Sequence, residues 1–219
     1  MNQIRMTLVC AVFLAGVAGW AQEYPQAEAG FDYSYARYAP SAAYTQGHSL
    51  NGGGGSFVYN IAEYLGLKAD FQGYGSTTTH FVIPPGVSSK FPGGGTGNVQ
   101  GNLFTYLFGP QLKVRIPKIQ PFAHLLFGGA HSNVYGNAFK TICQPTVGAC
   151  AFSKTPSGNA FAMAFGGGVD IPIGKRVSVR PAEIDYLLTN FNNPFNNGVQ
   201  NNFRYSGGIN FNFGTSTVP

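Results

Sequence analysis

Eight segments of this chain alternate apolar and polar residues at every second position, a pattern typical of β-strands with two different faces. Each segment is at least as long as the roughly 9–11 residues that a tilted strand needs to cross a bilayer. The alternation therefore predicts an all-β chain whose strands are able to span a membrane. The segments are residues 26–38, 50–62, 64–77, 99–116, 119–134, 158–173, 176–190 and 201–213.

The connections between these segments alternate in length. Tight turns are expected near Glu63, at Pro117-Lys118 and at Gly174-Lys175. The long connections are rich in Gly, Asn, Pro and Ser and cover residues 39–49, 78–98, 135–157 and 191–200. Short turns at one end and long loops at the other are typical of outer-membrane barrels, in which the short turns face the periplasm. We therefore predict an eight-stranded antiparallel up-and-down transmembrane β-barrel.

The two faces of the segments differ in a way that favours lipid on the outside. In the last segment, Phe203, Tyr205 and Phe211 share one face, whereas Arg204 and Asn210 share the other. With the aromatic face outward, the outer wall carries almost no charge, and such a surface would aggregate in water. Because hydrocarbon offers the backbone no hydrogen-bond partners, strands cross it only as a closed sheet.

The charged residues on the opposite face carry both signs, so they are able to neutralise one another inside the barrel. The interior of an eight-stranded barrel is just filled by side chains, which argues against a wide diffusion pore. We expect a narrow, plugged interior lined by a charge network of Glu28, Asp32, Lys68, Asp70, Lys113, Arg115, Asp170, Glu183, Asp185 and Arg204.

Arg180 does not fit this arrangement. It shares a face with Ile184 and Tyr186, which would direct it toward lipid. We expect it at the periplasmic rim, where a long basic side chain extends its charge into water. The alternative is a β-bulge at Pro181 that changes the register.

Composition excludes several other classes of protein. Charged residues make up 10% of the chain, compared with about 25% in soluble domains. The aromatic content of 15% excludes a disordered chain. Beyond residue 20 no window approaches the roughly 18 apolar residues that a spanning helix needs. The net charge of +5 includes no basic cluster, so no nucleic-acid partner is expected.

The first residues have the features of a secretory signal peptide. A short basic start precedes the apolar run Met6–Val17, and the expected cleavage site follows Ala21. We therefore expect a signal peptide over residues 1–21, a barrel over 22–213 and a short tail over 214–219. In a chain exported to the bacterial outer membrane, Cys143 and Cys150 are expected to form a local disulfide.

Several stretches of the chain resemble the OmpA-like outer-membrane β-barrel domain family. They are residues 106–110, 121–130, 159–170, 180–181, 185–188 and 204–209. The resemblance covers essentially the whole mature chain and implies an eight-stranded barrel with both ends in the periplasm. Family barrels often end on an aromatic residue that the assembly machinery reads. Here Phe211 and Phe213 are followed by six more residues, so that signal would be internal.

The sequence predicts no catalytic residue, cofactor or metal site. The glycine runs do not open a helix, so they do not form a phosphate-binding loop. The function expected is structural, or is carried by the extracellular loops. The expected partners are outer-membrane lipids, the outer-membrane assembly machinery and an unidentified ligand of the loops.

Two alternative functions remain open. An outer-membrane lipid-modifying enzyme would need a Ser–His pair, for which His80 with Ser76 and His131 with Ser132 are the candidates. Neighbouring positions on a strand face opposite ways, which argues against the second pair. A secreted, soluble lipocalin-like binding barrel would need an apolar interior, whereas the predicted interior rows are polar.

Overall fold

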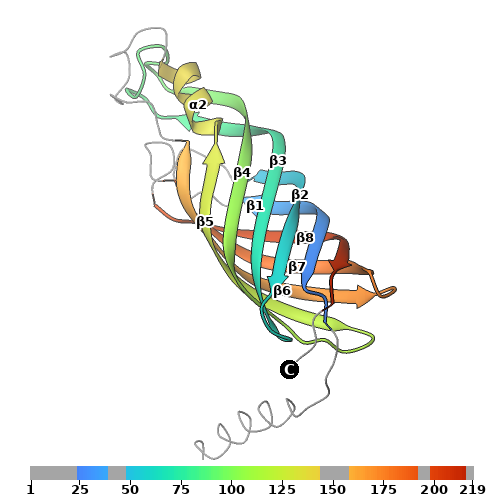
Figure 1. The fold of residues 1–219 in the computed structure, drawn as a ribbon. Coiled ribbons are helices and arrows are strands. Elements are labelled where there is room, and N and C mark those ends of the chain that lie inside the picture. Colours follow the sequence, from blue (N-terminus) through green and yellow to red (C-terminus); the bar gives the residue numbers. More distant parts are fainter. Residues whose placement is uncertain (1–23, 39–47, 144–157, 192–197, 216–219) are drawn as a thin grey trace, which may run out of the picture.

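The computed structural model describes residues 24–38, 48–143, 158–191 and 198–215. These residues form a closed barrel of eight antiparallel strands (Figure 1). Each strand pairs with the next one along the chain, and β1 also pairs with β8. The predicted fold class is therefore confirmed. The elements are β1 (Ala27–Tyr38), β2 (His48–Asn60), β3 (Leu65–Ile83), β4 (Gly95–Lys113), β5 (Gln120–Ser132), α2 (Val134–Cys143), β6 (Asn159–Pro172), β7 (Val177–Asn190) and β8 (Gln200–Phe213).

The outer wall of the barrel is covered by large apolar side chains. On β4, Phe104, Tyr106 and Phe108 are 43–56% exposed, while Thr105 and Leu107 between them are buried. We call this outward-facing surface the apolar belt, because it is the face that a membrane would cover. Its members include Phe31, Tyr33, Phe57, Leu67, Phe71, Phe104, Phe108, Leu112, Phe127, Phe161, Phe165, Ile184, Phe203, Ile209 and Phe213.

The apolar belt ends at a ring of exposed polar residues on the side of the long connections. On β4, for example, the outward row changes from Phe104 to Asn102 and Gln100. Such a change marks the level at which the strands leave the hydrocarbon. The ring comprises Arg37, Asn51, Asn102, His131, Asn159, Asn190 and Asn201.

Beyond this ring, β3 and β4 continue as a projecting ribbon, and the two faces exchange polarity. The prediction of a long loop over residues 78–98 is therefore wrong in its bounds, because β3 runs to Ile83 and β4 starts at Gly95. In the ribbon, Phe81 and Val99 are buried, whereas His80 faces solvent. A strand pair outside the membrane has water on its outer face, so its apolar side chains must be covered from within.

Helix α2 supplies that cover and lies beside the upper ends of β3 and β4 (Figure 1). It occupies part of the connection that was expected to be an irregular loop over residues 135–157. Side-chain hydrogen bonds join it to the ribbon and to the connection between the two strands: the Asn137 side-chain amide donates to the Gln100 carbonyl at 2.9 Å, and the Ser88 hydroxyl donates to the Ile142 carbonyl at 2.6 Å. Its buried face consists of Val134, Tyr135, Ala138, Phe139, Ile142 and Cys143.

Some predictions fall on parts of the chain that are not described. The signal peptide over residues 1–21 lies outside the described residues, and so does Cys150, so the disulfide with Cys143 stays a prediction. Within the described residues, no helix combines the length and the apolar character that crossing a bilayer requires.

Arg180 lies inside the barrel, so the rim position expected for it is wrong. The pairing of β7 with β8 shifts between Arg180 and Glu183, which face Gly208 and Ser206. Pro181 and Ala182 therefore stand opposite the single residue Gly207, as in a β-bulge. The extra residue reverses the alternation, so Arg180 and Glu183 both point inward.

Candidate functional site

The charged interior is the most distinctive feature of the barrel. Nine of the ten residues predicted to line it are buried, and Asp32 is half-buried. The interior holds six of the eight acidic residues of the sequence, together with five Lys or Arg side chains. The structure thus brings together residues from β1, β3, β4, β6, β7 and β8 that lie as far as 176 positions apart in the sequence.

Arg204 on β8 joins two carboxylates across the barrel. Its Nη1 lies 2.7 Å from Asp70 Oδ1, and its Nη2 lies 2.6 Å from Asp185 Oδ2. The Arg204 Nε also donates to Asp185 Oδ2 at 2.7 Å. These are charge-assisted contacts, in which a planar guanidinium bridges two fixed anions on β3 and β7.

Lys68 and His124 occupy the adjacent position. Lys68 Nζ donates to Glu183 Oε1 at 2.8 Å, and it lies 3.4 Å from His124 Nδ1. The other ring nitrogen of His124 lies 2.8 Å from Asp185 Oδ1. The histidine therefore links the Lys68–Glu183 pair to the Arg204–Asp185 pair in one continuous cluster.

Nearer the short turns, Arg180 continues the same network. Its Nε and Nη2 bind the two oxygens of Asp170 at 2.8 and 3.1 Å, and its Nη1 donates to Glu183 at 2.6 Å. The guanidinium also lies over the ring of Phe122, at 4.3 Å from the centroid. Glu183 thus accepts from both Arg180 and Lys68 and connects the two parts of the interior.

The network ends in contacts around Glu28. Lys113 binds both Asp170, at 2.7 Å, and Glu28. Arg115 Nη2 donates to Glu28 at 2.6 Å, and the Asn60 amide donates to the same carboxylate at 3.0 Å. Every polar contact of this kind offsets part of the cost of removing charges from water.

The other predicted member of the interior, Asp32, lies apart from the ion pairs. Its carboxylate accepts a hydrogen bond of 2.8 Å from the Gln72 amide. Among the described residues, no cation lies within ion-pair distance of it.

One group of potential metal ligands occurs in the described part of the chain, and it lies within this network. Ligand atoms of His124, Glu183 and Asp185 are within 4.8 Å of one another. Lys68 and Arg204 already contact these carboxylates at 2.8 and 2.6 Å. A divalent cation would therefore face two fixed positive charges, and we assign no metal to the group.

Toward the long connections, beyond the charge network, the interior becomes apolar. Leu107, Leu126 and Leu187 are at most 1% exposed, and they belong to a core that continues into α2 and the projecting ribbon. The ring of Tyr135 on α2 lies 5.2 Å from that of Phe191, which follows β7. The interior therefore has a charged layer toward the short turns and an apolar layer toward the long connections.

Of the two Ser–His pairs considered for catalysis, the structure describes both side chains of His131–Ser132 only, and these two are not assembled. His131 faces outward and lies 2.8 Å from the Asn159 amide oxygen, whereas Ser132 is buried and accepts from the Val134 amide. His80 lies 2.6 Å from the side chain of Asn98. The side chain of Ser76 lies outside the described set.

Two members of the network, His124 and Arg180, were not among the residues predicted to line the interior. Both parities of residues 121–127 are apolar apart from His124, so alternation alone does not show which row faces inward. For Arg180, the signal was Pro181, because proline in a strand is found mainly at edges and bulges.

The apolar belt, the closed sheet and the ion-paired interior together define a small outer-membrane β-barrel protein. The chain belongs to the outer membrane protein β-barrel domain family, whose model matches residues 7–214. No curated protein sequence matches the chain.

Solved structures of outer-membrane barrels are similar to this chain at low sequence identity. Neisserial surface protein A is 13% identical with a TM-score of 0.56, and the match covers 88% of this chain and 99% of that one. The attachment invasion locus protein of Yersinia pestis is 11% identical with a TM-score of 0.47, covering 87% and 99%. The N-terminal barrel of Pseudomonas aeruginosa OprF is 15% identical with a TM-score of 0.44, covering 88% and 100%.

Proposed function

We propose that this protein is an outer-membrane barrel with a plugged interior and no catalytic activity, which acts structurally and through its extracellular surface. The observation that carries the proposal is the ion-paired layer formed by Arg204, Arg180, Lys68 and their carboxylates. A path for solutes would have to break several buried ion pairs at once, which is costly because each would leave an unpaired charge. The apolar layer above it would add a second barrier to ions.

Conductance across a planar lipid bilayer tests the plugged interior. The folded protein should give no steady open level, whereas a wide porin reconstituted in parallel should conduct. Folding is checked beforehand by the heat-dependent shift in gel mobility. A stable, large conductance of the folded protein would disprove the plugged interior.

The absence of catalysis is tested separately, because it rests on different residues. In detergent, the protein should neither hydrolyse an acyl ester nor transfer an acyl chain between lipids. Activity that is lost in His80→Ala or His131→Ala would instead support the lipid-modifying enzyme.

The surface role is supported by the charge of the extracellular segments. Exposed Lys90 lies close to α2, where its ammonium donates to the Thr141 carbonyl at 3.2 Å, and Lys140 is exposed on the helix itself. These segments contain no Asp or Glu, so nothing in them offsets the positive charge. We therefore expect an anionic partner. The acid-free segments are residues 37–53, 73–105, 129–165 and 186–203.

Binding to lipopolysaccharide tests this surface. The wild-type protein should bind phosphorylated lipopolysaccharide more tightly than the dephosphorylated form, and added salt should reduce the difference. The double variant Lys90→Gln/Lys140→Gln should lose most of this preference, while Lys118→Gln on the periplasmic β4–β5 turn should keep it. Equal binding of both forms by the wild-type protein would contradict an anion-directed surface.

A further inference from the structure

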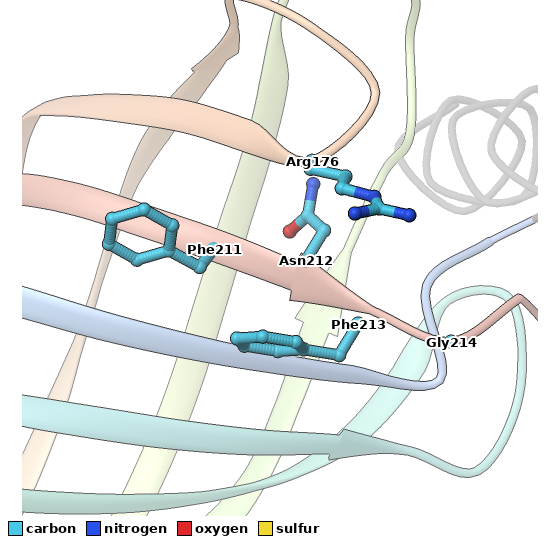
Figure 2. Close-up of a pocket in the computed structure, with 5 residues that line it drawn as sticks. All are labelled: Arg176, Phe211, Asn212, Phe213 and Gly214. Atoms are coloured by element: carbon cyan, nitrogen blue, oxygen red, sulfur yellow. The ribbon is translucent and has the colours of Figure 1, made fainter.

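A pocket of about 320 Å³ lies at the periplasmic end of β8 (Figure 2). Arg176 enters it from the β6–β7 turn, and the other lining residues are Phe211, Asn212, Phe213 and Gly214. The backbone N–H of Asn212 donates to the backbone carbonyl of Arg176 at 2.8 Å, which holds the turn against the end of β8. The β6–β7 turn and the end of β8 therefore form the two sides of the pocket.

The basic side of this pocket is formed by the guanidinium of Arg176. Arg176 is exposed, and its guanidinium makes no hydrogen bond or ion pair with any residue that the structure describes. The five Lys and Arg side chains of the interior, in contrast, all contact carboxylates. Lys175, next to Arg176, is also exposed and adds a second positive charge to the same turn.

The other side of the pocket belongs to the apolar belt. Phe211 and Phe213 face outward and are 40% and 54% exposed. In Figure 2 the Arg176 guanidinium lies toward the Gly214 end of β8, and both rings extend along the strand away from that end. At Gly214 the chain turns away with φ +67°, a conformation that favours glycine, so the strand does not continue over the pocket.

The position of the pocket relative to the membrane follows from its neighbours. In the same β6–β7 turn, Ile173 is 70% exposed, and it is followed by Gly174, Lys175 and Arg176. The outer surface therefore changes from apolar to basic within a few residues. In a membrane this is the level at which the hydrocarbon of the periplasmic leaflet meets its phosphate groups.

We propose that this pocket binds an anionic phospholipid of the periplasmic leaflet. The phosphate diester accepts hydrogen bonds from the Arg176 guanidinium, whose planar donors match two phosphate oxygens. One acyl chain lies along the rings of Phe211 and Phe213. Asn212 offers a polar side chain near the headgroup, and Lys175 raises the local positive potential without lining the pocket.

Native mass spectrometry of the full protein in detergent, with dioleoylphosphatidylglycerol added, tests this site. The wild-type protein should retain one such lipid in preference to dioleoylphosphatidylcholine, whose choline shields its phosphate. The variant Arg176→Gln removes the charge-assisted hydrogen bonds and should weaken retention about tenfold. Lys175→Gln removes the same charge from the neighbouring exposed position and should weaken it far less.

Two further measurements make the result decisive. Phe213→Ala should lower retention of the lipid while leaving Arg176 in place, provided that the gel-mobility shift shows a folded barrel. Inorganic phosphate should not displace the lipid, because it lacks the acyl chain. Equal losses in the Arg176 and Lys175 variants, or displacement by inorganic phosphate, would overturn a phospholipid site.

Discussion

The substitution Arg204→Met tests the reasoning on the interior most directly. Arg204 is fully buried and lies within 2.7 Å of both Asp70 and Asp185. Methionine has a similar length but no charge, so the substitution removes the cation without creating a large cavity. Asp70 would keep only Lys68 at 3.9 Å, and Asp185 would keep only His124 at 2.8 Å.

The expected cost is that of breaking a buried ion pair from one side, about 3–5 kcal/mol of unfolding free energy. Removing a carboxylate as well should restore most of it, because a buried pair replaced by apolar residues of similar volume is often neutral in stability. We therefore expect Arg204→Met/Asp70→Leu to be more stable than Arg204→Met. The two substitutions should be coupled by roughly 3 kcal/mol.

Urea-induced unfolding in lipid vesicles measures this quantity. Residues 22–219 contain no tryptophan, so far-ultraviolet circular dichroism and the gel-mobility shift are suitable signals. The free energies come from linear extrapolation to zero urea. Additive costs for the two substitutions, or a cost below about 1 kcal/mol for Arg204→Met, would refute a tightly coupled ionic interior.

Three other substitutions, two of them with a matched control, probe the rest of the wall in the same unfolding assay. Leu126→Ala should cost about 2–5 kcal/mol, because it opens a cavity in the fully buried apolar layer. Phe31→Lys should cost about 2–4 kcal/mol if the apolar belt faces lipid, whereas Gln100→Lys on the exposed face of the ribbon should cost nothing measurable. Gly54→Ala should prevent or impair folding, because its Cβ would lie 2.0 Å from the Phe71 carbonyl oxygen, while Gly97→Ala has open space and should be tolerated. Equal tolerance of the two alanines would contradict the close approach of β2 and β3.

The number of strands and the orientation of most side chains were predictable from the sequence. A two-residue period is a local property, and the long apolar–polar rows extend over whole strands. The inward position of the ten charged residues follows from the same period. Arg204 and the polar residues in its row lie on the face opposite the aromatic residues, so if the aromatic face is outward, the charged face is inward. Which cation meets which carboxylate was not predictable, because the partners come from six different strands.

The inward position of Arg180 depends on long-range pairing. The bulge exists because two residues of β7 stand opposite Gly207 of β8, and that register is set by the whole strand pair. The helix α2 is a similar case. Its sequence contains Gly136 and several β-branched residues, so its local helix propensity is modest. It is stabilised by burying Phe139 and Ile142 against the ribbon, a surface that only the folded chain provides.

Alternation, strand length and the scarcity of charge are local properties, and a closed barrel with lipid outside and polar groups inside satisfies all three, so this much is written in the sequence. The pairing of the buried charges, the inward position of Arg180 and the exchange of polarity in the ribbon arise only in the folded chain. These depend on register and on the surroundings of each face. Both are set by strands that are distant in sequence and become neighbours when the sheet closes.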